Sequence, residues 1–298
     1  MNREVNMKIA VMKERRADER RVAATPETVK KFVGLGVDIV VEAGAGGAAH
    51  IADSEFQEAG AVIAADAAAA LDGADVVLKV RRPIMDDEDE GPNELAQLRK
   101  GQALVAMLNP LIRRSDCDAY AAAGIDAYAM ELMPRISRAQ SMDVLSSQAN
   151  LAGYKAVLDA TEEYDRALPM MMTAAGTIAP AKIFVMGAGV AGLQAIATAR
   201  RLGAVVSATD VRPVAKEQVQ SLGAKFVMVE DEETAEAETA AGYAKEMSEE
   251  YQKKQAALIA ETISKQDIVI CTALIPGRAA PTLVDEAMVA SMRPGSVI

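Results

Sequence analysis

The stretch "KIFVMGAGVAGLQAIATARRLGAVVSATDVR", residues 182–212, decides the fold class of the chain. An apolar, strand-like run leads into three glycines spaced G-x-G-x-x-G, at Gly187, Gly189 and Gly192. An alanine-rich helical segment follows, and a second β-rich run ends at Asp210, eighteen residues beyond the last glycine. The glycines alone would be a weak signal. In this order of strand, turn, helix, strand and acidic residue, they predict a dinucleotide-binding β-α-β unit.

Each part of this motif has a physical role. Gly187 permits a tight turn, Gly189 lets the backbone approach a pyrophosphate, and Gly192 lets the helix pack closely on the strand. The helix N-terminus offers unpaired amide donors to the phosphates. Asp210 can accept hydrogen bonds from both hydroxyls of the adenosine ribose. Its charge would repel a 2′-phosphate, which favours NAD over NADP, although Arg212 nearby weakens this preference.

The rest of the chain repeats the β-α-β order, which predicts parallel sheets. β-rich runs lie at 8–14, 38–44, 76–80, 103–108 and 126–132, and again at 182–187, 204–210, 224–229, 267–273 and 295–298. We therefore expect an α/β chain of two Rossmann-like lobes, each a doubly wound, mainly parallel sheet, with a cleft between them. Residues 1–146 form the N-terminal lobe, residues 147–298 form the nucleotide-binding lobe, and a long helix at 147–167 joins them. The last run looks cut off, so we expect the second sheet to continue beyond it.

Composition limits the function classes. The 298 residues carry a formal net charge of -11, which argues against a nucleic-acid partner. No apolar run is long enough to span a membrane, and the N-terminus lacks a secretory signal. Cys117 and Cys271 lie far apart without a CxxC motif, which predicts two free thiols in a reducing compartment.

The sequence lacks evident acid–base machinery. Its one histidine, His50, follows the glycine-rich run "EAGAGGAAH", whose glycine spacing predicts a turn and not a second nucleotide site. No Cys, His and carboxylate cluster has metal-ligand spacing, so we expect no metal, and no G-x-S-x-G nucleophile is present. An NAD site without a proton acceptor fits a binding module, or a hydride transfer that moves no proton.

Two further segments leave alternatives open. Residues 230–250 hold nine acidic residues and one lysine, and they read either as a solvated loop or as a lid with Tyr243 at its tip. The stretch "PRISRAQSMDVLSSQANLAGY", residues 134–154, packs many hydrogen-bonding side chains at the join between the two lobes. Taken by itself, this stretch is most simply a solvated linker.

Several segments together resemble a known superfamily. "KERRADERRVAATPE" resembles the N-terminal signature of the alanine dehydrogenase and nicotinamide nucleotide transhydrogenase superfamily. "RISRAQSMDVLSSQANLAGY", "TAAGYAKEM", "TALIPGRAAP" and the segment at 170–204 are similar to its transhydrogenase branch. They match the NAD(H)-binding component, domain I of the α subunit, of the proton-translocating enzymes. The resemblance covers essentially the whole chain.

The resemblance implies a soluble two-lobed component, usually a homodimer, that is active only with its partners. An NADP(H)-binding component and a membrane component would complete the enzyme and hold this one in the cytoplasm, peripheral to the inner membrane. Hydride would pass directly from one nicotinamide to the other, coupled to proton translocation. Such a transfer needs no base, because no oxygen or nitrogen gains or loses a proton.

The resemblance also assigns the site residues. The polar stretch becomes the loop that holds the nicotinamide, where Arg135, Gln140, Asp143 and Ser146 would contact the carboxamide, the nearby ribose and the partner's nucleotide. The remaining cofactor contacts would be Val190 at the pyrophosphate, Val211 and Arg212 beside Asp210 at the adenosine, Gly242 and Tyr243 on the mobile loop, Gln255 just after it, and Thr272, Ala273 and Leu274 at the nicotinamide.

Two alternatives remain. In the alanine dehydrogenase branch an arginine and a lysine bind the amino-acid carboxylate, and Arg21 and Lys79 match those two positions. That branch also carries a histidine where the run "ALVAMLNP", residues 103–110, has none. The other alternative is a non-enzymatic NAD(H)-binding module.

Overall fold

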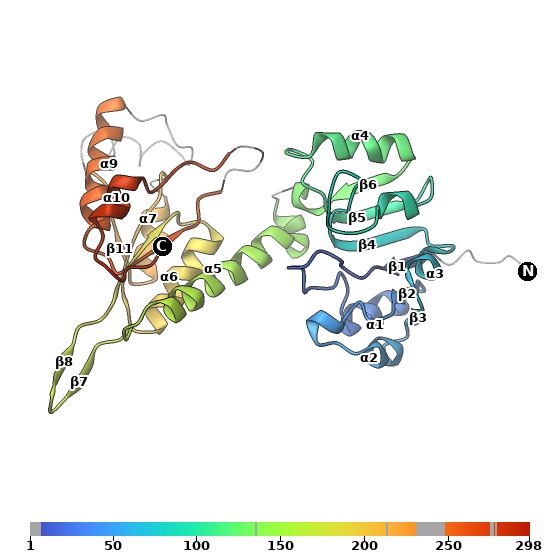
Figure 1. Cartoon of the computed structure of the whole chain (residues 1–298), viewed down its shortest axis with the longest axis horizontal. Coiled ribbons are helices and arrows are strands. Elements are labelled where there is room, and N and C mark those ends of the chain that lie inside the picture. The colour runs from blue at the N-terminus through green and yellow to red at the C-terminus, as the bar shows by residue number, and fades with distance from the viewer. Residues whose placement is uncertain (1–6, 135, 213, 231–247, 275–276, 278) are drawn as a thin grey trace, which may run out of the picture. The chain divides into compact units, whose positions relative to one another are not determined.

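The computed structural model describes residues 7–134, 136–212, 214–230, 248–274, 277 and 279–298. The chain divides into two compact units, Met1–Val144 and Leu145–Ile298. Each unit is built around its own parallel sheet (Figure 1).

The first unit contains a six-stranded sheet in the order β3-β2-β1-β4-β5-β6, with every neighbouring pair parallel. The strands are β1 (Lys8–Val11), β2 (Asp38–Glu42), β3 (Val62–Ala64), β4 (Val76–Arg81), β5 (Ala103–Met107) and β6 (Asp126–Ala129). This is the strand order of dinucleotide-binding doubly wound folds, with the winding direction reversing between β1 and β4.

The helices of this unit follow from local sequence signals. They are α1 (Pro26–Gly34), α2 (Asp53–Glu58), α3 (Ala67–Leu71) and α4 (Arg114–Ala123), with short 3-10 helices η1 (Gly47–Ala49), η2 (Leu95–Gln97), η3 (Met130–Leu132) and η4 (Ser137–Met142). The helix α1 begins after Thr25, whose side chain accepts a hydrogen bond from the Thr28 amide, and Pro26 takes the first helical position.

Both faces of the first sheet are packed. Alternate residues of β1 point to opposite sides: Ile9 and Val11 join the core under α1 and α2, whereas Ala10 joins the core under α3 and α4, as does Met12 directly after the strand. The parallel sheet agrees with the β-α-β order of the sequence, and a strand that is buried on both faces is apolar along its whole length. The fold class is therefore confirmed for this unit.

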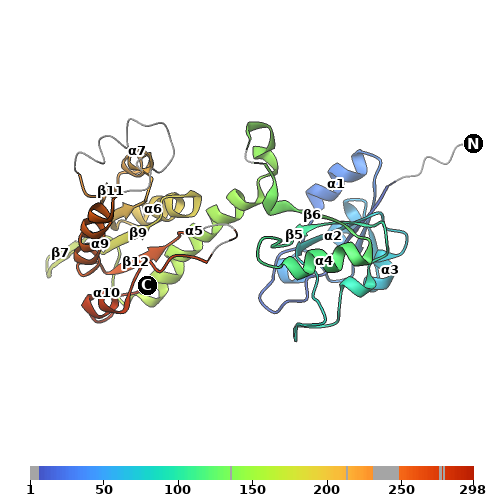
Figure 2. The same ribbon diagram turned by 90° about the horizontal axis from the view of Figure 1, so that it is seen from above.

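The second unit contains a parallel sheet in the order β11-β10-β9-β12. Its strands are β9 (Lys182–Met186), β10 (Val205–Thr209), β11 (Lys225–Phe226) and β12 (Ile268–Cys271), and its helices are α5 (Val144–Glu163), α6 (Val190–Arg201), α7 (Ala215–Ser221), α9 (Glu249–Ile263) and α10 (Glu286–Ser291). Ile183 and Val185 pack toward α5, α6 and α7, and Phe184 and Met186 pack toward α9 and α10. In both ribbon views α5 runs beside α6 (Figures 1 and 2). This sheet is also doubly wound.

Several predicted bounds differ from those in the structure. The strand expected at 224–229 ends at Phe226, because the Val229 amide bonds to the side chain of Gln255 and not to β10. The long helix begins at Val144 and ends at Glu163, with Asp143 directly before it in the position that aspartate favours. The run expected at 295–298 reaches the sheet through one bridge, between Val297 and Ile268.

The sequence did not predict a hairpin between α5 and β9. Its strands, β7 (Met171–Thr173) and β8 (Gly176–Ile178), pair only with each other among the described residues (Figure 1). Their side chains are exposed on both faces.

Candidate functional site

The strand order of the second unit brings two predicted segments together. The strand β9 lies between β10 and β12, so the winding direction reverses at its carboxyl end, where ligands of open α/β sheets bind. The glycine turn follows β9, and the run from Thr272 to Leu274 follows β12. The hydroxyl of Thr272 donates to the Gly187 carbonyl oxygen at 2.8 Å, so the two turns are in direct contact.

The three glycines of the turn meet different surroundings. Gly187 has φ +103°, and a Cβ there would lie 2.8 Å from the Thr272 hydroxyl oxygen. A Cβ on Gly192 would lie 1.8 Å from the Gly187 carbonyl oxygen. A Cβ on Gly189 would meet no atom within 4 Å. The first and third glycines are thus needed by the protein itself, while the second leaves space open before the N-terminus of α6.

The structure ties Asp210 to the glycine turn. Its Oδ2 accepts from the Ala188 amide at 2.7 Å, and Ala188 stands between the first two glycines. Its Oδ1 accepts from the amide of Arg212 at 2.8 Å and from the Nε at 2.9 Å. The Nη2 of Arg212 also donates to Oδ2, at 3.0 Å, so about four acceptor sites of the carboxylate are occupied. A ribose hydroxyl would therefore replace a bond from the exposed side chain of Arg212.

The same contacts fix the charge of Asp210. Its side chain is 7% exposed, and burial by itself would raise its pKa. The hydrogen bonds from Arg212 and from the Ala188 amide outweigh burial, and the pKa of Asp210 falls below its ordinary value. Asp210 is therefore a fixed negative charge at neutral pH, the property that the choice of NAD over NADP requires.

Exposed apolar side chains lie on the elements that carry this arrangement. Val190 begins α6, Val211 follows Asp210, and Leu274 follows β12; their exposed fractions are 37%, 85% and 78%. Ala273 is partly buried. Large apolar side chains left in water at the ligand-binding edge of a sheet are available to cover the flat rings of a nucleotide.

Gln255 is held by the protein itself. From α9 its Oε1 accepts from the Val229 amide at 2.8 Å, and its Nε2 donates to the Thr209 hydroxyl at 3.3 Å. Thr209 is the last residue of β10 and immediately precedes Asp210. The resemblance assigns Gln255 to the cofactor site, and in the structure its hydrogen bonds join α9 to the residue directly before Asp210.

The predicted nicotinamide loop forms η4 and the start of α5. Gln140 is exposed, its carbonyl accepts from the Asp143 amide at 3.3 Å, and the buried Ala139 anchors the turn. Asp143 and Ser146 are half-buried at the beginning of α5. Arg135, Gly242 and Tyr243 lie outside the described residues, as does most of the acidic segment for which a lid was considered.

The two cations that match the alanine dehydrogenase positions are already paired. Lys79, with a 4% exposed side chain, donates to Glu94 at 2.9 Å and lies 3.6 Å from Glu14. Arg21 donates to both carboxylate oxygens of Glu19, at 2.7 and 2.6 Å. An incoming carboxylate would have to displace an internal carboxylate from each cation.

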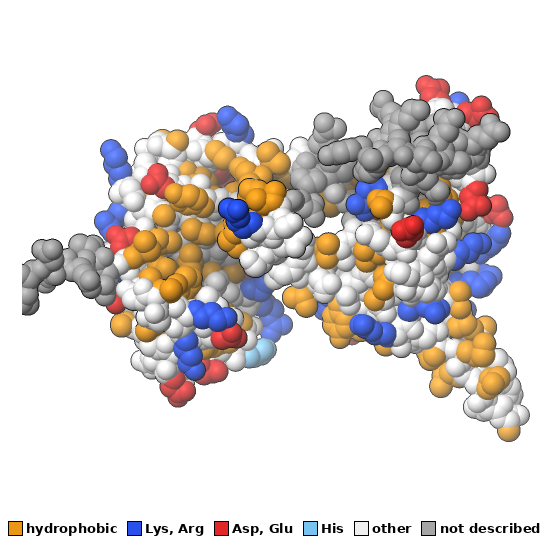
Figure 3. Space-filling view, turned by 180° about the vertical axis from the view of Figure 1, so that it is seen from behind, with side chains coloured by type: hydrophobic (Ala, Val, Ile, Leu, Met, Phe, Trp, Pro, Cys, Tyr) orange, Lys and Arg blue, Asp and Glu red, His pale blue; other side chains and the backbone are white. Residues whose placement is uncertain are grey.

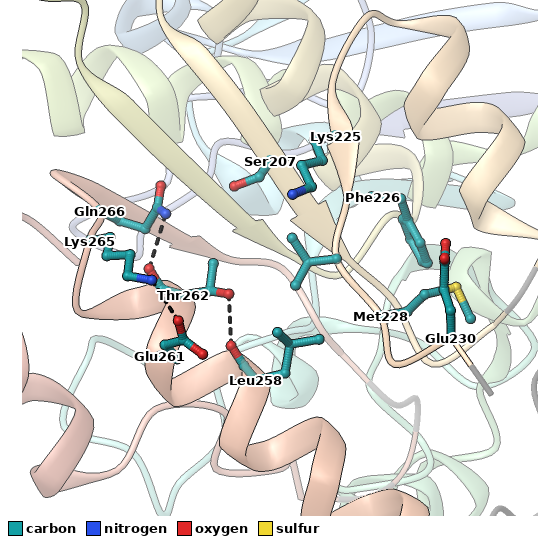
Figure 4. Close-up of a pocket in the computed structure, with 11 residues that line it drawn as sticks. Ser207, Lys225, Phe226, Met228, Glu230, Leu258, Glu261, Thr262, Lys265 and Gln266 are labelled. Atoms are coloured by element: carbon teal, nitrogen blue, oxygen red, sulfur yellow. Dashed lines mark hydrogen bonds and ion pairs between the residues drawn. The ribbon is translucent and has the colours of Figure 1, made fainter.

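A hollow of about 530 Å³ lies elsewhere in the second unit, over β10 and β11 beside α9 (Figure 4). Several of its polar groups are paired within the second unit. Lys265 bonds to Glu261, the Thr262 hydroxyl to the Leu258 carbonyl, and the Gln266 amide to the Thr262 carbonyl. The hollow also lies away from the carboxyl ends of β9 and β12, so the glycine turn is the better candidate for the nucleotide site.

Other sequence predictions concern residues outside the site. His50 is exposed and ends η1 with φ 59°, as expected of a turn residue. In the described ranges no three His, Cys, Asp or Glu side chains are grouped to hold a metal ion. Among the helices of the described part of the chain, none is both long enough and apolar enough to cross a membrane.

Comparisons with known proteins agree with this geometry. The family model "Alanine dehydrogenase/PNT, N-terminal domain" matches residues 10–152, and "Alanine dehydrogenase/PNT, C-terminal domain" matches residues 156–298. The chain is 60% identical to an NAD(P) transhydrogenase subunit alpha polypeptide of Rhodospirillum rubrum over 292 residues, covering 98% of this chain and 76% of that protein.

Two further similarities separate the branches. The solved structure of the transhydrogenase from Sinorhizobium meliloti matches with a TM-score of 0.87 and 59% identity, over 97% of this chain and 77% of that one. The alanine dehydrogenase of Halomonas elongata is 30% identical over 295 residues, covering 98% of this chain and 71% of that protein. The chain is thus far more similar to the transhydrogenases.

Proposed function

The chain belongs to the alanine dehydrogenase/PNT family, and from this premise we propose that it is the NAD(H)-binding component of a proton-translocating transhydrogenase. It binds NAD(H) at the glycine turn of the second unit, and hydride passes directly between this nucleotide and NADP(H) on a partner. The single observation that carries the nucleotide assignment is the bond from the Ala188 amide to Asp210, which fixes an ionised carboxylate against the glycine turn.

The residues present fit a dinucleotide. The space before Gly189 and the free amides of the first turn of α6 suit a pyrophosphate. Asp210 suits the ribose hydroxyls, and Val211 and Leu274 offer exposed apolar surface to the rings. NAD(H) supplies the hydride-carrying carbon. The chain's own residues bind and orient it, and orientation by itself can contribute several kcal/mol, on the order of 7, to such a step.

The nicotinamide is positioned by the loop of η4 and α5 in this proposal. A carboxamide has one acceptor and two donors, and Gln140, Asp143 and Ser146 offer complementary groups. Arg135 is assigned to the same loop. The resemblance of residues 135–154 to the transhydrogenase branch supports this assignment, as does the exposure of Gln140.

Amino-acid dehydrogenation fits less well. The pairing of Lys79 with Glu94 and of Arg21 with Glu19 leaves neither cation available to a substrate carboxylate without displacement. The strand β5 and the residues after it also supply no histidine for acid–base work. Wild-type protein should therefore not reduce NAD when supplied with alanine.

We also propose a homodimer in which the β7–β8 hairpin contacts a second copy. The hairpin extends from the body of the second unit with apolar side chains along it (Figure 3). Met172 is 74% exposed, Met170 57% and Ile178 54%, and residues 170–178 include no charged side chain. An isolated two-stranded hairpin is marginal in water, so an apolar partner surface would stabilise it.

The partners in this proposal are an NADP(H)-binding component and a membrane component, which would hold the chain at the membrane. The decisive experiment is reconstitution. Purified chain, NADH and a purified NADP(H)-binding transhydrogenase component should reduce NADP by direct transfer of deuterium from [4-²H]NADH. The chain with either nucleotide alone is the control. If NADH bound but no deuterium reached the partner's nucleotide, the chain would be a non-enzymatic NAD(H)-binding module.

A further inference from the structure

The first turn of α6 is confined by two close backbone contacts. On the β9 side, a Cβ on Gly192 would lie 1.8 Å from the Gly187 carbonyl oxygen. On the α5 side, a Cβ on Gly153 would lie 2.0 Å from the Ala191 carbonyl oxygen and 2.8 Å from its carbonyl carbon. Non-bonded heavy atoms pack at about 3.5–4.0 Å, so a side chain at either glycine would have to move this turn.

The sequence motif accounts for Gly192 but not for Gly153. Gly153 is buried within the 20-residue helix α5, where glycine is a poorer helix former than alanine. Its neighbours Ala152 and Tyr154 are exposed, so the requirement comes only from the face toward α6. Asn150, one turn earlier, donates to the side chain of Gln194 on α6 at 3.2 Å. A close helix contact explains why glycine stands here.

The atom that Gly153 approaches belongs to the amides of the candidate phosphate site. The peptide unit is planar, so the Ala191 carbonyl and the Gly192 N–H move together. That N–H is one of the free donors of the first helical turn, which point toward a bound pyrophosphate. Pushing the carbonyl away from α5 would therefore re-aim a donor to the phosphates.

We propose that Gly153 is a positioning residue of the nucleotide site, a fourth glycine of the phosphate-binding turn contributed by α5. Because Gly153 has no side chain, α5 can pack directly against the first turn of α6. This contact sets the direction of the amide groups that would donate to the pyrophosphate. The inference rests on the proposed NAD(H) binding and adds α5 as the helix that aligns the phosphate-binding turn. The ribose contact is separate, because the hydrogen bonds that hold Asp210 come from Ala188 and Arg212 and not from α5.

The test compares Gly153→Ala with Ala152→Gly in the full chain. Binding of NADH is followed by its fluorescence, and ADP and adenosine are titrated in competition with it. ADP carries a pyrophosphate and adenosine does not. In Gly153→Ala, NADH and ADP should bind about tenfold more weakly or worse, as expected for one lost charge-assisted hydrogen bond. Adenosine should bind as it does to the wild type.

The control separates alignment from helix stability. Ala152→Gly weakens the helix propensity of α5 at an exposed site and should leave all three affinities unchanged. Wild-type ADP affinity in Gly153→Ala would overturn the inference, and so would equal losses for ADP and adenosine. If the wild type itself did not bind NADH, the proposed function would fail instead.

A second variant covers the case in which Gly153→Ala does not fold. Asn150→Ala removes the polar contact between α5 and α6 without adding an atom. In this variant ADP should bind about threefold more weakly, as expected for the loss of one neutral hydrogen bond, and the affinity for adenosine should be unchanged. Unchanged ADP affinity in Asn150→Ala would then count against a positioning role for α5.

Discussion

The hydroxyl of Thr272 donates to the carbonyl oxygen of Gly187 at 2.8 Å. This bond joins the end of β12 to the turn after β9, across the point where the winding of the sheet reverses. A Cβ on Gly187 would lie only 2.8 Å from the same hydroxyl oxygen. Thr272 therefore does more than line the site: it holds the glycine turn in place from the opposite side of the sheet's switch point.

Removing this hydroxyl should weaken nucleotide binding. Thr272→Val keeps the shape of the side chain and deletes the hydrogen bond, so NADH should bind about threefold to tenfold more weakly. Titration of NADH fluorescence measures the change. Thr161→Val is the matched control, because it deletes a hydroxyl that bonds to the Val157 carbonyl within α5. Equal losses in the two variants would mean that the Gly187 contact has no special role.

Asp210 should decide the choice between NADH and NADPH. Asp210→Ala removes the acceptor for the ribose hydroxyls and the charge that repels a 2′-phosphate. The affinity for NADH should fall at least about tenfold, and the difference between the affinities for NADH and NADPH should become smaller. Arg212→Ala removes the cation of the same ion pair and leaves the charge of Asp210 unpaired. The preference for NADH over NADPH should therefore increase. Equal affinity for NADH and NADPH in the wild type would refute this role.

A partly buried group of ion pairs in the first unit gives a prediction about pH. Glu88 accepts from Arg16 and twice from Arg82, each at 2.7 Å. Burial opposes ionisation, but the hydrogen bonds from Arg82 and Arg16 outweigh it and lower the pKa of Glu88 from 4.5 to about 2. A depressed pKa stabilises the fold above the unfolded value and stops doing so as the pH falls through the folded value.

Glu88→Gln should therefore destabilise the first unit at pH 7 by up to about 3 kcal/mol. The difference from wild type should shrink as the pH is lowered from 4.5 toward 2. Urea unfolding followed by far-UV circular dichroism at several pH values measures it. Glu27→Gln, which removes an exposed helix-surface pair with Lys31, should have little effect at any pH. A deficit that does not depend on pH would point to lost packing and not to lost charge.

The hairpin predicts a change in oligomeric state. Met172→Asp places a charge on its most exposed apolar position, and burying an unpaired charge in an interface is costly. The variant should sediment as a monomer under conditions in which the wild type is a dimer. Val205→Asp is the control: Val205 is a 50% exposed apolar side chain of the same unit, on β10. A dimer that survives Met172→Asp would place the interface elsewhere.

Local patterns predicted the segments of the site that are continuous in sequence. The glycine turn, α6 and Asp210 follow one another within residues 182–212, and each has a strong local preference. The strands were found because burial on both faces makes them apolar throughout. The brace from Gln255 to Thr209 was not foreseen, because it depends on which of several polar side chains on α9 reaches the end of β10.

The same reasoning explains the remaining errors. The strand β11 ends early because a side chain from a distant helix takes the amide of Val229. The hairpin at 171–178 was not predicted, because "MMMTAAGTI" lacks the alternation of a half-buried strand when both of its faces are exposed. No sequence pattern explained the glycine at position 153 of α5, because the reason for it is the close approach of Ala191 on α6.

The nicotinamide loop gives the sharpest test of hydride transfer. Gln140 is exposed on η4, and the nucleotide's adenosine and pyrophosphate would be held elsewhere, by Asp210 and the glycine turn. Gln140→Asn keeps the amide and shortens the side chain by one methylene. Misplacing reacting groups by about 1 Å can slow a reaction by on the order of a hundredfold. With the NADP(H)-binding component supplied, single-turnover hydride transfer should slow strongly, while the dissociation constant for NADH stays close to that of the wild type.

Ser137→Ala, on the same exposed turn, is the control and should leave both the transfer rate and the dissociation constant unchanged. A large loss of NADH affinity with a normal transfer rate would make the loop a binding clamp and would leave ring alignment to other residues.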